Sequence, residues 1–339
     1  MAKRKKALTI VVVLLAALGV AAGIFAKHYL MATYGGDVPA RVNIPAGISD
    51  AGVRDILNSS LGSFGSKVYT LWHMQKGNAA VAQGSYEVEP GTTALRLSRT
   101  IAKGRQTPVI LTTNVFRTRA ELASRVADVM EFDATAFLAA ADSILGAAGI
   151  DTLNTTAAFV PDSYEFYWTA SPAKVATVMF DNRNAFWTAE RRSRAAALGL
   201  TPEQVHTLAS IAMSETNKPD ELGAVARLYL NRMARGMALQ ADPTVVFAGG
   251  DFTVRRVSRR MLDIESPYNT YIHKGLPPGP IRMVTRAALD AVLTAPAHDY
   301  LYMCARPDFS GYHDFALTYD RHRINAALYH RALERRGIR

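Results

Sequence analysis

The chain has 339 residues, of which 49% are hydrophobic and 20% charged, so it can build two globular domains and is not a wholly disordered protein. Its formal net charge of +10 lies at the two ends: five Lys/Arg and no acid in residues 1–30, and six Arg against one Glu from residue 321 onward. The stretch between them is neutral, which argues against a nucleic-acid-binding protein. The single cysteine, Cys304, excludes an intramolecular disulfide.

The N-terminus predicts a membrane anchor. Four basic residues, Lys3 to Lys6, precede an uncharged run over residues 7–26. Twenty residues at about 1.5 Å each span the roughly 30 Å hydrocarbon core of a bilayer. The basic cluster keeps residues 1–6 in the cytoplasm, so we expect a single-pass inner-membrane protein with its remaining chain in the periplasm. A cleaved signal peptide is the alternative, although the run is long for one.

A tether over residues 27–40 and a small α+β module over residues 41–115 are expected next. Two stretches, 41–57 and 85–101, each run as a strand, a Pro/Gly turn and a helix. Ser49 or Asp50 would cap the first helix, and Thr92 or Thr93 the second. Residues 107–115 ("TPVILTTNV") are rich in β-branched side chains and predict a further strand.

Residues 116–339 predict a larger, mostly helical domain with short strands. Thr201, Pro202 and Gln204 form a helix start with a capping box, and Gly199 separates that helix from the one before it. A new helix is expected from residue 220, polar-aromatic loops over residues 236–279, a helix over 285–295, a strand over 299–304 and a basic helix at the end.

The stretch "LASIAMSETNK" contains a carboxylate where the pattern asks for an apolar residue. An apolar stripe along one face of a helix is predicted by the i, i+3, i+4 spacing of Leu208, Ile211 and Ala212. The next position on that face, i+7, is Glu215. A buried carboxyl keeps its proton to higher pH and can then act as a general acid, as the cleavage of a glycosidic bond requires. The alternative is a helix that frays after Met213 and leaves Glu215 in water.

Other common catalytic signatures are missing from the sequence. It contains no GxSxG, GxGxxG or Walker A motif, and none of its eight histidines falls in HExxH. We therefore expect neither a cofactor nor a metal site.

Six blocks carry a family resemblance. They are "FVPDSYEFYW", "LASIAMSET" with "ELGAVARLYLNR", "GMALQADPTVVF", "SPYNTYIHKGLPPGPI" and "HDYLYMCARPDFSGYHDF". In this order and spacing the chain resembles the endolytic murein transglycosylase (MltG or YceG-like) family, in the form of its Bacteroidetes branch. The resemblance implies an α+β fold with one membrane span, a LysM-like module (residues 41–115) and a catalytic domain (residues 116–339).

The resemblance also implies roles for individual residues. The family's catalytic glutamate maps onto Glu215 in Ser214-Glu215-Thr216, although Met213 stands where many members have another glutamate. Glu221 and His313 would support the site, and Asp220 is expected to cap the following helix. Substrate-binding roles, with loop bracing as the alternative for each, map onto Gln240, Asp242, Thr244, Tyr268, Asn269 and Tyr271.

The activity implied is a lytic cleavage of nascent peptidoglycan between MurNAc and GlcNAc, which leaves 1,6-anhydroMurNAc ends and limits strand length. Peptidoglycan strands would be the substrate and peptidoglycan synthases possible partners. The alternative is a non-catalytic, membrane-anchored glycan-binding scaffold. An ordinary muramidase would need a second well-placed carboxylate, which the sequence does not identify.

Overall fold

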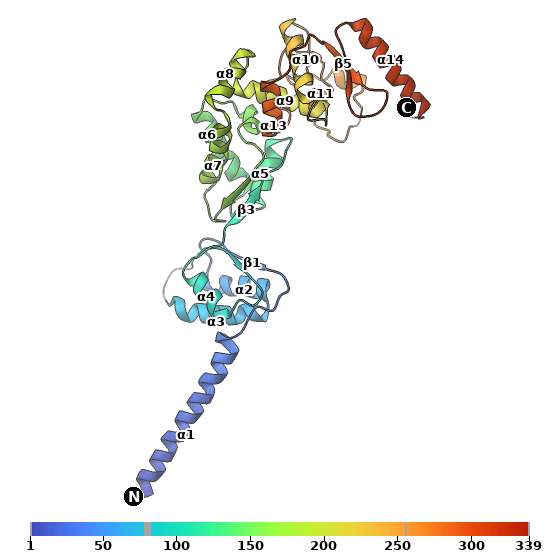
Figure 1. Cartoon of the computed structure of the whole chain (residues 1–339). Helices are drawn as coiled ribbons and strands as arrows, with labels where there is room; N and C mark the ends of the chain where they lie inside the picture. Colours follow the sequence, from blue (N-terminus) through green and yellow to red (C-terminus); the bar gives the residue numbers. More distant parts are fainter. Residues whose placement is uncertain (1, 78–82, 255, 338–339) are drawn as a thin grey trace. The chain divides into compact units, whose positions relative to one another are not determined.

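The computed structural model describes residues 2–77, 83–254 and 256–337, which fold into two compact units (Figure 1). The N-terminal unit comprises residues 1–111, 129–131 and 165–170. The C-terminal unit comprises residues 112–128, 132–164 and 171–339. Each unit has a hydrophobic core of its own.

The first element is an apolar helix, α1 (Ala2–Phe25), which continues as a short π-helical turn over Ala26–Leu30. Residues 4–30 are long and apolar enough to cross a membrane. The helix therefore extends past the predicted run of residues 7–26 into the segment expected to be a tether. The rest of that segment is hydrogen-bonded to the N-terminal unit, because the backbone N–H of Tyr34 donates to the carbonyl of Thr92 at 2.8 Å.

After α1, the core of the N-terminal unit is built from a two-stranded sheet and the helices around it. Strand β1 (Ala40–Ile44) pairs antiparallel with β2 (Gly84–Val88), and the register places Ala40 opposite Val88. The two strand-turn-helix repeats are confirmed, since the side chains of Ser49 and Thr93 cap the helices that follow β1 and β2. Ser49 caps α2 (Asp50–Leu61) and Thr93 caps α4 (Ala94–Ala102), whereas α3 (Ser63–Lys76), which follows α2, has no side-chain cap.

Gly65 lets α3 approach α2 closely. A Cβ atom at this position would lie 1.9 Å from the carbonyl oxygen of Leu57, a distance that no relaxed structure tolerates. Around this contact, Leu57, Val68 and Trp72 are buried in the core of the unit. The packing of the two helices therefore depends on the missing side chain.

The C-terminal unit is mostly helical, with short strands. The division between the two units falls within strands β3 (Val109–Thr112) and β4 (Ser163–Phe166). Strand β3 is shorter than the strand predicted over residues 107–115 and pairs with β4, not with the β1–β2 sheet. The unit's early helices are α5 (Arg119–Ala127), α6 (Ala134–Ala147), a 3-10 helix (Thr152–Ala157), α7 (Pro172–Phe186) and α8 (Ala189–Ala197).

The later elements of this unit include two that the sequence did not predict. Short helices α11 (Asp242–Gly249) and α12 (Arg259–Leu262) lie within the segment expected to be loops. The remaining elements are α9 (Pro202–Glu215), α10 (Leu222–Ala234), α13 (Arg286–Leu293), the antiparallel hairpin of β5 (Tyr302–Ala305) and β6 (His313–Ala316), and α14 (Tyr319–Arg335).

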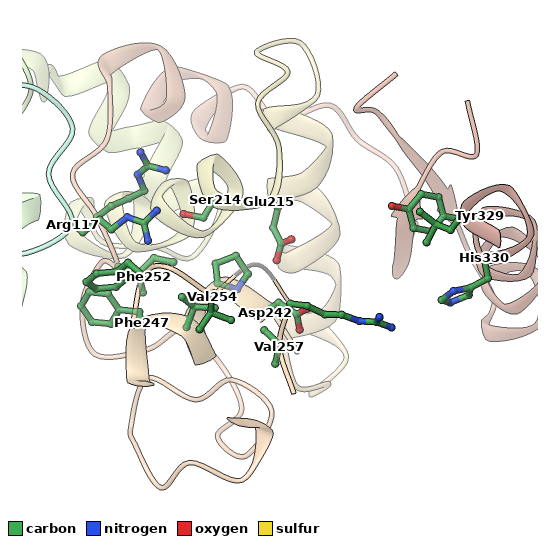
Figure 2. A pocket seen from close by; sticks show the side chains of 16 residues that line it. Arg117, Ser214, Glu215, Asp242, Phe247, Phe252, Val254, Val257, Tyr329 and His330 are labelled. Atoms are coloured by element: carbon green, nitrogen blue, oxygen red, sulfur yellow. The ribbon is translucent and has the colours of Figure 1, made fainter. Parts of the chain in front are cut away.

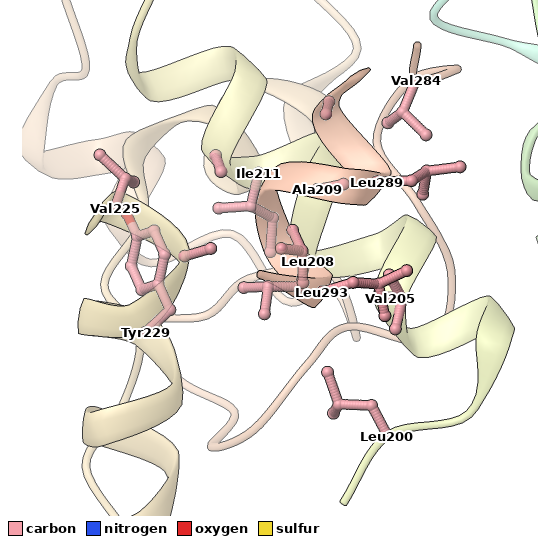
Figure 3. Packing of buried hydrophobic residues seen from close by; sticks show 14 of the residues in the cluster. Leu200, Val205, Leu208, Ala209, Ile211, Val225, Tyr229, Val284, Leu289 and Leu293 are labelled. Atoms are coloured by element: carbon pink, nitrogen blue, oxygen red, sulfur yellow. The ribbon is translucent and has the colours of Figure 1, made fainter. Parts of the chain in front are cut away.

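Helix α9 lies at the centre of this unit's core, against α10 and α13 (Figure 3). Leu208 and Ile211 are fully buried, as the apolar stripe predicts. However, every residue from Val205 to Ala212 is buried, including His206 and Ser210, so the helix has no solvent face over this length. Burying a Leu or Ile side chain contributes about 1.5–3 kcal/mol, which holds α9 firmly in place.

Candidate active site

Glu215 is the last residue of α9, where the buried helix reaches an open region of the unit. The predicted capping box fixes the start of this helix: the Thr201 side chain accepts from the N–H of Gln204, and the Gln204 side chain accepts from the N–H of Thr201. At the other end Thr216 turns to extended backbone. The helix does not fray after Met213, so Glu215 is held by helical geometry.

The carboxyl group of Glu215 is enclosed by protein, although the residue keeps a face toward two cavities. The hydroxyl of Tyr229, a residue only 2% exposed, donates to its Oε1 at 2.7 Å. The pKa of Glu215 is raised from 4.5 to about 7. Burial is the largest cause and the negative charge of Asp242 acts in the same direction, whereas the Tyr229 hydrogen bond and the positive charge of Arg232 oppose the rise. Near neutral pH this group can therefore both give and take a proton.

Arg232 provides a buried positive charge near Glu215. Its guanidinium group donates from Nε to the carbonyl of Leu301 at 2.7 Å and from Nη1 to that of Leu239 at 2.7 Å. Backbone carbonyls thus hold the side chain, and burial lowers its pKa. Tyr229 and Arg232 are three positions apart on α10 and so share one face of that helix.

Asp242 and Tyr271 form the other side of the site. The Tyr271 hydroxyl donates to Oδ1 of Asp242 at 2.5 Å, and burial is the first cause of a raised pKa at Tyr271. Gln240 lies two residues before Asp242 with a positive φ of 52°. Its backbone N–H donates to the carbonyl of Thr270 at 3.0 Å, which fixes this strained turn beside the cavity.

Two cavities meet at Glu215 and Asp242. The larger has a volume of about 750 Å³ and an apolar wall that includes Val246, Phe247 and Phe252. Figure 2 shows Arg117 at one end of it, Tyr329 and His330 at the other, and Glu215 between them. The smaller, of about 280 Å³, is lined by Glu215, Tyr229, Arg232, Gln240, Asp242, Tyr271, Tyr302 and His322, among others.

Three of the residues expected to bind substrate brace the loops instead of lining these two cavities. Thr244 is fully buried, and its hydroxyl donates to the carbonyl of Ala241 at 2.7 Å and bonds to the Thr270 hydroxyl. Asn269 is fully buried and donates to two backbone carbonyls. Tyr268 packs against Phe247, with ring centroids 4.8 Å apart.

Glu221 and His313 pair with each other away from the cavities. The Glu221 carboxylate accepts from the backbone N–H of His313 at 2.7 Å and lies 2.8 Å from His313 Nδ1. This contact ties the start of α10 to β6, and Glu221 is only 5% exposed. Asp220 does not cap α10 as predicted: the helix begins at Leu222 without a side-chain cap, and Asp220 accepts from the Tyr312 hydroxyl.

Sequence reasoning missed Tyr229, Arg232, Arg117 and Arg282, which reach the site from other elements. The spacing of Tyr229 and Arg232 in "LYLNRM" was the available signal, but a Tyr and an Arg on a helix are ordinary residues. Met213 packs against the hydrophobic core and does not line either cavity. Among the described residues, no group of three or more His, Cys, Asp or Glu side chains is placed to hold a metal ion.

An enclosed carboxyl group with a pKa near neutrality, facing a cavity of ligand size, makes this region of a mostly helical unit a candidate general acid–base site. The sequence pattern of the YceG-like family matches residues 42–327. This chain therefore belongs to the YceG-like family.

Curated relatives share part of the chain. Over 100 residues it is 39% identical to the endolytic murein transglycosylase of Bacillus subtilis (strain 168), a match covering 30% of this chain and 28% of that protein. Over 110 residues it is 30% identical to the endolytic murein transglycosylase of Streptococcus pneumoniae serotype 2 (strain D39), covering 31% of this chain and 20% of that protein. The matches thus span under a third of these relatives.

A solved structure shares the fold. The crystal structure of a YceG-like protein from Listeria monocytogenes matches with a TM-score of 0.57 and 23% sequence identity, covering 85% of this chain and 99% of that one. The resemblance to the Bacteroidetes branch stays a prediction.

Proposed function

We propose that the protein is an endolytic lytic transglycosylase that cleaves the β-1,4 bond between MurNAc and GlcNAc in nascent peptidoglycan strands and so limits their length. One observation carries the proposal: Glu215 has a pKa of about 7 and faces a cavity of about 750 Å³. A cavity of this size accommodates a short stretch of glycan. The names of the curated relatives support the same activity.

In the proposed mechanism, one carboxyl group acts twice. Protonated Glu215 gives its proton to the glycosidic oxygen, the C1–O bond of the muramoyl residue breaks, and positive charge develops on that ring. The carboxylate then takes the proton from the C6 hydroxyl of the same residue, and the C6 oxygen bonds to C1. The 1,6-anhydro ring closes without water, and Glu215 regains its proton. The Tyr229 hydroxyl, donating to Oε1, stabilises the carboxylate between the two steps.

The placement of the protein follows from its substrate. We propose that the apolar run of residues 7–26 anchors it in the inner membrane, with residues 1–6 in the cytoplasm and the site in the periplasm, where glycan strands are. The strand-helix-helix-strand order of β1, α2, α3 and β2 supports a LysM-like, glycan-binding module. Peptidoglycan synthases, which make nascent strands, are the proposed partners.

Product analysis of purified peptidoglycan tests the activity. The full chain in detergent should release fragments ending in 1,6-anhydroMurNAc, detected by mass spectrometry as a loss of one water relative to a reducing end. Glu215→Gln should abolish them, because an amide cannot donate this proton, while Glu265→Gln, at an exposed position, should not. If the unaltered protein leaves the strands uncut, the proposed activity is wrong and the alternative of a non-catalytic glycan-binding scaffold is favoured.

Hydrolysis is the second candidate function, and Asp242 favours it. Its carboxylate lines both cavities together with Glu215, which gives the pair of carboxyl groups that a muramidase needs. The lytic reaction is preferred because Oδ1 of Asp242 already accepts from Tyr271. Reducing MurNAc ends in place of anhydro ends would establish hydrolysis.

A further inference from the structure

Among the described residues, three arginines line the larger cavity without an acidic partner: Arg256, and the neighbouring pair of Arg117 and Arg282. Arg117 and Arg282 both line it, and Nε of Arg282 is buried without a hydrogen-bond acceptor. In the described part of the chain, the arginines that form ion pairs are Arg41, Arg54, Arg119, Arg183, Arg191, Arg194, Arg286 and Arg306. Arg117 is exposed, whereas Arg282 is partly buried, and guanidinium groups are rarely left unpaired when partly buried, so Arg282 needs an explanation.

Backbone contacts set the two arginines side by side. The N–H of Met283 donates to the carbonyl of Phe116 at 2.7 Å, which pairs the segments that carry Arg282 and Arg117. The N–H of Ile281 donates to Oγ of Ser210 at 3.0 Å, so the same segment is fixed to α9, the helix that ends in Glu215. The arginines are thus placed by the element that also positions the acid.

The residues around Arg117 and Arg282 orient the two guanidinium groups but do not neutralise their positive charges. The guanidinium of Arg117 lies over the Phe252 ring, 4.8 Å from its centroid, which restricts where it can point. Burial lowers the pKa of Arg282, and the positive charge of Arg117 lowers it further. The carboxylate of Glu121 accepts from the backbone N–H of Arg117 at 2.9 Å, and in the described part of the chain no carboxylate forms an ion pair with the Arg117 side chain. A bound anion would relieve both the repulsion and the unmet hydrogen-bonding capacity.

We propose that Arg117 and Arg282 form a subsite for a carboxylate of the peptide stem carried by a muramoyl residue; this rests on the proposed function. Planar guanidinium groups bind carboxylates through paired hydrogen bonds. Peptidoglycan offers a carboxylate from two sources, the stem peptide and, where the stem has been removed, the lactyl group on the sugar. The lactyl group lies on the reacting ring, close to the bond that Glu215 would cleave.

The position of the pair favours the stem. The charges that perturb the pKa of Glu215 are those of Asp242 and Arg232 and include neither Arg117 nor Arg282, and Figure 2 shows Arg117 at one end of the cavity. A stem peptide extends several residues from the sugar and reaches this end. The wall of the same cavity includes Val246, Phe247 and Phe252, which suit the apolar part of a short peptide.

Binding to the uncleaving Glu215→Gln chain tests the proposal independently of catalysis. Titration calorimetry on the full chain in detergent would compare three probes: a GlcNAc–MurNAc disaccharide with its stem peptide, the same disaccharide with a free lactyl carboxylate, and a chitin oligomer of equal length. Adding Arg282→Gln or Arg117→Gln should raise Kd for the stem-bearing probe about 10-fold to 100-fold, because charge-assisted hydrogen bonds are lost. The other two probes should change less than about two-fold.

Two further variants separate recognition from general effects. Arg235→Gln removes the same charge at an exposed position outside both cavities and should leave Kd unchanged. Arg282→Lys keeps the charge without the paired donors and should recover part of the affinity. Circular dichroism and thermal melting would confirm that each variant is folded. Because Arg117 is exposed, Arg117→Gln should leave the packing of the core unchanged.

The outcomes are distinct. Unchanged Kd for the stem-bearing probe in both arginine variants would overturn the subsite, and an equal loss for the stem-free disaccharide would assign the pair to the lactyl carboxylate. Arginine-dependent binding of the stem-bearing probe by a chain that produces no anhydro ends would refute the proposed activity while leaving this recognition intact.

Discussion

Replacing Glu215 by Gln should stabilise the folded protein at alkaline pH, because the site holds a carboxyl group where ionisation is unfavourable. Folding raises the pKa of Glu215 from 4.5 to about 7. Each whole step of pKa corresponds to about 1.4 kcal/mol, so complete ionisation costs the folded state roughly 3 kcal/mol. Glutamine has nearly the same shape, can still accept from Tyr229 and does not ionise.

The sign follows from proton binding. Below pH 4.5 the carboxyl is protonated in both folded and unfolded chains, and Glu215 adds no pH dependence. Between pH 4.5 and about 7 the folded chain holds the proton more tightly, so its free energy of unfolding falls as the pH rises. Above that range the loss is complete. The advantage of Glu215→Gln should therefore be absent at low pH and largest, on the order of 1–3 kcal/mol, at pH 8.

Urea unfolding of the full chain in detergent, followed by circular dichroism at several pH values, measures this difference. Glu265→Gln serves as the matched control, since Glu265 is exposed and its substitution should produce no pH-dependent change. A Glu215→Gln advantage that stays constant from pH 4 to pH 8 would refute the reasoning, because it would mean that the carboxyl is not desolvated.

Three further predictions test the site and the fold. Tyr229→Phe removes a hydrogen bond that lowers the pKa of Glu215, so the alkaline limb of the pH–rate profile should move up by about 1–2 pH units; a downward shift would contradict it. Asp242→Asn removes a charge that raises this pKa, so the same limb should move down, and no movement would show that the two carboxyls do not interact. Gly65→Ala should lower the free energy of unfolding by about 2 kcal/mol or more, because its Cβ would collide with the Leu57 carbonyl, whereas Gly146→Ala, with open space around it, should cost nothing; equal denaturant midpoints for the two variants would rule out the close approach of α2 and α3.

Local signals were sufficient for the elements themselves. The capping box of Thr201 and Gln204, the caps at Ser49 and Thr93 and the apolar run near the N-terminus each act within a few residues of the chain, so the sequence alone locates them. The same holds for Glu215, since its place in the helix follows from the spacing of Leu208, Ile211 and Ala212. The loop predicted over residues 236–279 was wrong at Asp242–Gly249, which forms the helix α11. This helix packs against α9, a segment distant in sequence, so no local signal located it.

Partners of the acid were decided by tertiary structure. Tyr229 and Arg232 come from α10, Arg117 precedes α5 and Arg282 precedes α13. Only packing brings them to the two cavities that meet at Glu215. Polar loop residues show the same limit: Thr244 and Asn269 are chemically as suited to a sugar as Gln240 and Asp242, but the fold buries the first two in backbone hydrogen bonds. A sequence specifies which groups are available, whereas desolvation and hydrogen-bond partners, which set the pKa of Glu215, exist only once distant segments have packed.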